Sequence, residues 1–225
     1  MSDARSRAEQ TARIIVEHGA FYIRTAGDPF FFTSGWASPL FIDCKKLISF
    51  PDARNALIEL SLDFIAGEIG LENIDSVAGC ELAGVPFAAM IADRIERPLV
   101  IVRKQGKGFG RLAQFEGHFD PGSKVLLVDD LATDGISKLA FRAALERAEA
   151  EVTWTFVLFD YDVFRSDADL ASLAKLHHVV DYMAKTNAID PQALVDLQNF
   201  AANAPRWSKR HGGISALPEK LSVGL

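Results

Sequence analysis

The chain has 225 residues, of which 49% are apolar, and a formal net charge of −6 at neutral pH. This length and apolar fraction suit one α/β domain with a substantial core, and they exclude a mostly disordered chain. The acidic balance disfavours a protein that binds nucleic acid through its phosphates, because such binding requires clustered lysine and arginine.

The two cysteines, Cys44 and Cys80, form no CxxC pair and predict neither a disulfide framework nor a zinc site. The first residues are charged and helix-like, so we expect no signal peptide, and no stretch is long and apolar enough to span a membrane. We therefore expect a soluble, cytoplasmic protein that binds neither nucleic acid nor membranes.

The first third of the chain predicts two helices separated by short strands. Residues 4–18 have the pattern of an amphipathic helix, which Gly19 ends. Residues 30–48 follow as short strand-like pieces, broken by serine, glycine and proline. Pro51 opens the second helix, and Gly70 stands where its C-terminal stop belongs.

From residue 76 onward, apolar strands alternate with helices. This alternation indicates a central, mostly parallel sheet that helices cover on both faces, with right-handed crossovers. The expected strands are 76–79, 98–103, 124–129 and 152–159, and the expected helices are 85–96 and 137–150.

Beyond Asp160 the pattern weakens. An aspartate–proline pair at 190–191 begins a last helix, after which we expect irregular backbone. We therefore expect a single domain over residues 1–225, in which 1–50 contribute an N-terminal cap and 203–225 form a C-terminal tail.

The stretch VLLVDDLATDGIS at 125–137 carries the most chemical information. A buried strand delivers Asp129 and Asp130 to its C-terminal end, where ligands bind in open α/β sheets. The small-residue turn that follows opens a helix, so its unpaired amides form a natural phosphate cradle, to which Thr133 and Ser137 add hydroxyl donors. The acids can bind sugar hydroxyls; the alternative is a plain strand–turn–helix with solvated or capping acids.

A response-regulator receiver domain also begins with an acid pair after an apolar strand. That fold requires a phosphoacceptor aspartate and then a lysine at later strand ends. Asp160 could be the first, but no such lysine follows, and more than a hundred residues precede the acid pair here. We therefore set the receiver interpretation aside.

The same stretch resembles the phosphoribosyl-diphosphate (PRPP) motif of type I phosphoribosyltransferases. The two acids, Thr133 and Gly135 match, whereas Asp134 and Ile136 stand where the family usually has small or hydroxyl residues. A carboxylate that faces a phosphate costs energy, so we expect Asp134 to point away. The PRPP-binding residues implied here are Asp129, Asp130, Ala132, Thr133, Asp134, Gly135, Ile136 and Ser137.

Two further segments resemble one branch of that family, the orotate phosphoribosyltransferases. The segment FFFTSGWASPLFID at 30–43 resembles the N-terminal cap, in which Phe41 would stack on the base; the alternative is core packing. The segment AGCELAGVP at 78–86 resembles the loop that holds pyrophosphate through backbone amides. Ala83 stands where the family usually has lysine, and without the family this would be an ordinary strand–loop–helix.

A third segment, VRKQGKGFG at 102–110, combines glycines with the cations Arg103, Lys104 and Lys107. Glycines suit a segment that must move, and cations suit a departing pyrophosphate; a solvated basic turn is the alternative. The segment resembles the mobile catalytic loop of the same branch, which reaches into the neighbouring subunit's site, so the resemblance implies a homodimer. Phe109 stands where the family often has histidine, so no role for a histidine is transferred.

The resemblance implies transfer of phosphoribose from PRPP to orotate, giving orotidine 5'-monophosphate and pyrophosphate in pyrimidine nucleotide biosynthesis. Mg²⁺ would be held mainly by PRPP, pyrophosphate and water, with no direct protein ligand. The implied catalytic residues are Arg103, Lys104, Lys107, Asp129 and Asp130, with the three cations also binding PRPP. The implied orotate-binding residues are Phe41, Thr133 and Tyr161.

Two departures concern the carboxylate of orotate. Thr33 stands where the cap often has lysine, and Tyr161 stands where an arginine often meets the carboxylate. A transferase for another pyrimidine or a purine base therefore stays open as an alternative. A regulator that binds PRPP without catalysis is a second one, but the acidic balance and the three loop cations favour the enzyme.

Overall fold

A six-stranded sheet forms the centre of this computed structural model, which describes residues 2–106, 114–164 and 170–217. The strands are β5 (Ser76–Cys80), β6 (Leu99–Val102), β7 (Phe115–Glu116), β8 (Lys124–Ala132), β9 (Glu151–Asp160) and β10 (Ala171–Lys175). They lie in the order β10-β9-β8-β5-β6-β7, and all neighbours run parallel except β6 and β7. The mostly parallel sheet predicted from the sequence is confirmed.

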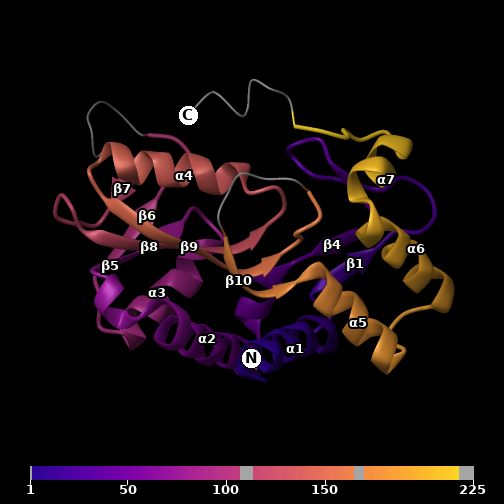
Figure 1. Cartoon of the computed structure of the whole chain (residues 1–225), viewed down its shortest axis with the longest axis horizontal. Helices are drawn as coiled ribbons and strands as arrows, with labels where there is room; N and C mark the ends of the chain where they lie inside the picture. The colour runs from indigo at the N-terminus through magenta and orange to yellow at the C-terminus, as the bar shows by residue number, and fades with distance from the viewer. Residues whose placement is uncertain (1, 107–113, 165–169, 218–225) are drawn as a thin grey trace.

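Helices cover both faces of this sheet (Figure 1). They include α1 (Ser2–Glu17), α2 (Pro51–Phe64), α3 (Gly84–Arg94) and α4 (Ile136–Arg147). Side chains of β8 point alternately to the two faces: Val125 and Leu127 pack with α4, whereas Leu126 and Val128 join the larger core with α1, α2 and α3. Burial on both faces explains the uninterrupted apolar run of this strand.

Two small antiparallel ribbons lie in the N-terminal region that is expected from the sequence to contribute a cap. In these, β1 (Phe21–Ile23) pairs with β4 (Leu40–Ile42), and β2 (Phe30–Phe31) pairs with β3 (Ala37–Ser38). The short strands expected over residues 30–48 are confirmed as far as Ile42, but the expectation is wrong for the last part, which forms a 3-10 helix, η1 (Cys44–Ser49).

Proline and glycine bound the second helix as the sequence predicts. Pro51 occupies the first turn of α2, and a π-helical turn, η2 (Ile65–Ile69), continues the helix. Gly70 ends it with a φ of 81°, a left-handed value that glycine adopts readily. A short 3-10 helix, η3 (Leu71–Asn73), then leads into β5.

The C-terminal helices lie beside the cap ribbons (Figure 1). They are α5 (Leu176–Thr186), α6 (Pro191–Ala202) and α7 (Ala204–Arg210). The Ser208 hydroxyl in α7 accepts a hydrogen bond from Ala37 N (2.9 Å) and donates one to Ile214 O (2.6 Å), which fastens the C-terminal helix to β3. Within the described residues, no helix is both long and apolar enough to cross a membrane.

The expectation of irregular backbone from residue 203 onward is wrong over α7. The Asn203 side chain accepts a hydrogen bond from Arg206 N (3.1 Å) and so caps this helix. The sequence reading also missed β1, β7, β10 and α5. For α5 a signal existed, because its buried residues fall at helical spacing, namely Leu176, Val179, Val180 and Met183.

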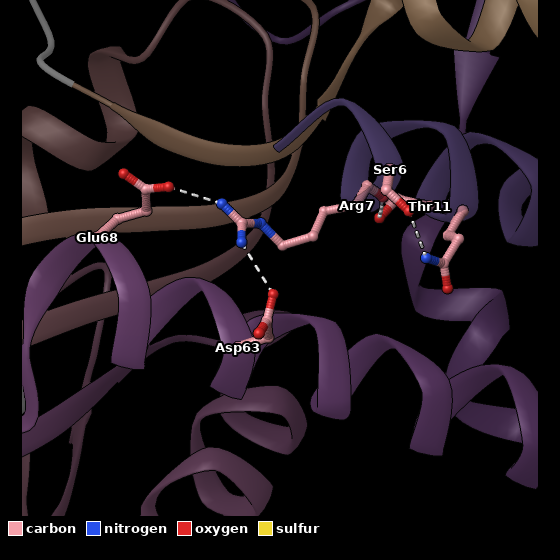
Figure 2. Close-up of polar contacts among 6 residues, drawn as sticks. Ser6, Arg7, Thr11, Asp63 and Glu68 are labelled. Atoms are coloured by element: carbon pink, nitrogen blue, oxygen red, sulfur yellow. Dashed lines mark hydrogen bonds and ion pairs between the residues drawn. The ribbon is translucent and has the colours of Figure 1, made fainter. Parts of the chain in front are cut away.

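A buried arginine fastens α1 to α2 and η2 (Figure 2). The guanidinium of Arg7 bonds Asp63 Oδ2 at 2.8 Å and Glu68 Oε1 at 2.7 Å. Its central carbon also lies 5.6 Å from the centre of the Phe64 ring. Three contacts on one planar cation hold the N-terminal helix against the sheet's helical layer.

Candidate active site

The C-terminal ends of β5 and β8 meet where the strand order of the sheet reverses. β6 and β7 lie on one side of β5, and β8, β9 and β10 lie on the other. Ligands in open α/β sheets bind at such a switch point. The segments predicted to bind pyrophosphate and PRPP follow these two strands, so the fold brings them together.

The two segments are in close contact at Gly84. A Cβ on this residue would lie 2.5 Å from Val128 O and 2.9 Å from Asp129 Oδ1. Only glycine lets the start of α3 approach the acid pair this closely. The peptide bond between Glu81 and Leu82, just before this contact, is cis.

The acid pair lies almost completely inside the protein. Asp129 and Asp130 are each 6% exposed, and Asp129 Oδ1 accepts a hydrogen bond from Asp130 N at 2.9 Å. Burial, reinforced by the charge of Asp129, raises the pKa of Asp130 to about 7. Asp160, at the end of the neighbouring strand β9, is also buried, and burial raises its pKa as well. Three carboxyl groups therefore gather at the ends of adjacent strands.

Lys138 is a member of this cluster that the sequence reading missed. Its Nζ lies 2.5 Å from Asp129 Oδ2 and 3.2 Å from Ser137 Oγ, and its side chain is 7% exposed. Burial lowers the pKa of Lys138, but Asp129, Cys80 and Asp130 together outweigh burial, and the net effect is a raised pKa. A signal existed in the sequence, because a lysine in the first turn of a helix opposes the helix dipole and requires a reason.

The turn between β8 and α4 has the shape of an anion cradle. Gly135 adopts a left-handed φ of 74° and caps α4, while Asp134 Oδ1 accepts a hydrogen bond from Ile136 N at 3.2 Å. The Asp134 carboxylate is itself buried, at 7% exposure. Thr133 is half-buried and Ser137 is exposed, and both residues lie within two positions of Gly135, the N-cap of α4, where unpaired helix amides can bind an anion.

Aromatic residues of the cap surround Phe41. Its ring centre lies 5.7 Å from that of Phe30, 6.3 Å from that of Phe32 and 6.4 Å from that of Tyr22. Phe41 is only partly buried, so this aromatic cluster does not enclose it completely.

Tyr161 connects the cap to the sheet. Its hydroxyl donates to Leu40 O (3.1 Å) and accepts from Ile42 N (3.0 Å), which are the neighbours of Phe41 on β4. The side chain is 1% exposed, and burial raises the pKa of its phenol. Its burial argues against the direct orotate contact that the resemblance implied, and favours a role in holding β4 in place.

The loop cations lie at the outer side of the site. Arg103 pairs with Glu116 of β7, and Lys104 N donates to Glu81 Oε2 at 2.9 Å, with the lysine side chain exposed. The second contact joins the start of the basic loop to the segment after β5. Lys107, the third predicted cation, lies outside the described residues.

The described residues contain no group of three or more histidine, cysteine or acidic side chains that could hold a metal ion. The adjacent histidines at 177 and 178 lie at the start of α5, where His178 Nδ1 accepts a hydrogen bond from Lys175 N at 3.0 Å.

Comparison with known proteins agrees with this geometry. The family described as "Phosphoribosyl transferase domain" matches residues 53–168. Orotate phosphoribosyltransferase of Rhizobium etli (strain CIAT 652) is 37% identical over 96% of this chain and 96% of its own, and that of Dinoroseobacter shibae is 40% identical over 93% and 96%.

Solved structures show the same fold. The crystal structure of orotate phosphoribosyltransferase from Aeropyrum pernix is 28% identical, with a TM-score of 0.65 over 80% of this chain and 99% of that one. Leishmania donovani UMP synthase has a TM-score of 0.73 and 24% identity, over 86% of this chain and 42% of that one. Because its sequence identity is only 24%, this second similarity shows the fold alone.

Proposed function

The chain belongs to the orotate phosphoribosyltransferase family, and we propose that it carries out that reaction at the ends of β5 and β8. The activity is transfer of phosphoribose from PRPP to orotate, which yields orotidine 5'-monophosphate and pyrophosphate (EC 2.4.2.10) in pyrimidine nucleotide biosynthesis. The observation that carries the assignment of the site is the buried acid pair packed against Gly84 at the switch point of the sheet.

The protein contributes mainly positions and charges to this reaction. Displacement at the anomeric carbon builds positive charge on the ribose ring and negative charge on the departing pyrophosphate. Asp129 and Asp130 bind the ribose hydroxyls, and ionised carboxylates beside the ring stabilise its positive charge. The cradle that binds the 5'-phosphate consists of Ala132, Thr133, Asp134, Gly135, Ile136 and Ser137.

The pyrophosphate lies between the segment after β5 and the basic loop. Backbone amides near Gly84 bind it from one side, while Arg103, Lys104 and Lys107 close over it from the other. Arg103 is paired with Glu116 in the structure, so closure requires it to exchange this partner for the ligand. Closure excludes water, which would otherwise hydrolyse the activated ribose.

The base lies between the cap and the cradle. Phe41 stacks on the orotate ring and Thr133 contacts its edge, while Tyr161 acts through β4 by holding the backbone on either side of Phe41. This division of roles explains how a buried tyrosine can occupy a position where the family often has an arginine.

Mg²⁺ fits this site as an ion that arrives with its substrate. The described residues provide no metal cage, so phosphate oxygens of PRPP and water would hold the ion. When bound, it would offset the negative charge of the pyrophosphate. We also propose a cytoplasmic homodimer that shares the basic loop across subunits, and the two buried, unpaired cysteines fit a reducing compartment.

The test is a Mg²⁺-dependent assay with PRPP and orotate, followed by the loss of orotate absorbance. Uracil, adenine and hypoxanthine serve as matched alternative bases. We expect turnover of orotate alone. Turnover of another base in its place would refute the assignment of orotate while retaining the PRPP chemistry.

A further inference from the structure

Lys138 is a buried cation to which the reaction described above assigns no role. Among the described residues, Arg7 and Lys138 are the buried basic side chains, at 5% and 6% exposure. Arg7 lies at the junction of α1 and α2, whereas Lys138 extends from the first turn of α4 to the acid pair.

Helix formation does not explain a lysine at this position. The positive end of the α4 dipole disfavours a cation in the first turn, and burying an ammonium group costs free energy unless it is paired. The contact with Asp129 Oδ2 at 2.5 Å supplies that pairing. A cation kept in place against both penalties indicates that the acid pair requires it.

Titratable groups from every neighbouring element face this cluster. Asp129 and Asp130 come from β8, Asp160 from β9 and Cys80 from β5, and Cys44 of η1 faces the acid pair. Burial raises the pKa of both thiols well above the ordinary value, so neither is charged at neutral pH. Within the described part of the chain, Lys138 is thus the buried cation that faces three carboxyl groups.

Asp129 is fixed at both of its oxygens. Its Oδ1 accepts a hydrogen bond from Asp130 N, and its Oδ2 meets the Lys138 ammonium. A carboxylate held in this way keeps one orientation before the ligand arrives, which lowers the cost of binding. PRPP carries several negative charges, and an acid pair without a counter-charge would repel it.

We propose that Lys138 is a positioning residue for phosphoribosyl transfer: its ammonium group holds the Asp129 carboxylate at the start of α4 and offsets its charge, so that the acid pair is oriented to bind the ribose hydroxyls. The inference rests on the function proposed above, because it requires PRPP at the acid pair.

The pH dependence of catalysis separates this role from a merely structural one. Burial and Asp129 raise the pKa of Asp130 to about 7, and Lys138 opposes that rise. Removal of the ammonium group therefore raises the Asp130 pKa further. Asp130 acts as an ionised group, so activity is lost as the pH falls through its pKa, and a variant without the cation loses activity at a higher pH than wild type.

The experiment measures kcat and KM for PRPP, with orotate, between pH 5.5 and 9.5 in wild type, Lys138→Met and Lys138→Arg. Arg142→Met is the matched control, because Arg142 lies on the same helix in an exposed pair with Glu146. For Lys138→Met we expect kcat/KM to fall about 100-fold at pH 7. We expect the midpoint of its acid limb to rise by about one pH unit.

Lys138→Arg should restore the midpoint and most of the rate, and Arg142→Met should match wild type. A wild-type pH profile in Lys138→Met would overturn the proposal, and so would a loss that is equal at every pH. If Lys138→Met does not fold, Lys138→Gln provides the test, since it keeps a donor for Asp129 without charge and should shift the midpoint equally. Failure of wild type to use orotate would instead refute the function itself.

Discussion

The molecule holds its two buried cations in different surroundings. Arg7 fastens α1 to α2 and η2, and its partners Asp63 and Glu68 keep 55% and 49% of their side chains exposed (Figure 2). Lys138 meets Asp129, whose side chain is 9% exposed and therefore as deeply buried as the lysine. Water solvates the acids in the first case and has little access to them in the second.

This difference in solvation distinguishes the structural contact of Arg7 from the candidate ligand-binding site around Lys138. Around Arg7 the protein satisfies a single guanidinium with two acids that water can also solvate, so no charge is left without compensation. Around Lys138, Asp130 and Asp160 remain buried in addition to the paired Asp129, and burial raises the pKa of each of the two. A buried excess of carboxyl groups costs stability and is typical of a place that binds a ligand.

The largest difference between the two surroundings should appear when the acids around each buried cation are replaced by amides. Asp129→Asn combined with Asp130→Asn should lower kcat/KM on the order of 10³-fold, because amides lack the charge that stabilises the ribose cation. The matched control, Asp63→Asn combined with Glu68→Gln, should leave kcat/KM unchanged. Steady-state assays with PRPP and orotate, together with circular dichroism to verify folding, measure both. Wild-type turnover in the first variant would remove the acid pair from the mechanism.

Replacing Arg7 tests whether its contacts with α2 and η2 serve stability alone. Arg7→Met should lower the free energy of unfolding by about 1–2 kcal/mol. The variant loses the two hydrogen bonds of the guanidinium, while the half-exposed carboxylates of Asp63 and Glu68 regain water. Urea unfolding measures this change. Turnover by the folded variant should equal that of wild type, and a selective fall in kcat would show that the Arg7 contact reaches the active site.

Sequence alone was sufficient for the elements that local patterns encode. The run from Val125 to Asp130 predicts a strand that ends in acids, and the small-residue turn with Gly135 predicts the helix start; both lie where expected. Pro51 and Gly70 bound their helix for equally local reasons.

Sequence was insufficient where distant residues decide the role of a side chain. Tyr161 read as a residue near the base, but it bonds the backbone at Ile42, 119 positions earlier, and is buried by the cap. Arg7 lies in a helix that the sequence predicts, but its burial depends on a partner, Asp63, that lies 56 positions away. Lys138 is only nine positions from Asp129, but its burial depends on how α4 packs over β8. Packing of this kind leaves no periodic signal in the chain.

The two surroundings also differ in how they make the stability of the fold respond to pH. Folding raises the pKa of Asp130 from an ordinary value near 4 to about 7, so the folded state holds this proton more tightly than the unfolded chain. Stability from this group is therefore greatest below pH 4 and falls as the pH rises toward 7, beyond which it stays constant.

Asp130→Asn removes the titrating group and with it this part of the pH dependence. The fall in Tm between pH 5 and pH 8 should shrink by about 5–10 °C relative to wild type, as measured by thermal unfolding without substrate. Arg7→Met serves as the comparison, because it lowers Tm at both pH values by a similar amount through loss of the α1 contact. If Asp130→Asn and wild type lose the same number of degrees, Asp130 ionises equally in the folded and unfolded chain. The cluster around Lys138 would then be solvated like the acids around Arg7, and the contrast between the two buried cations would disappear.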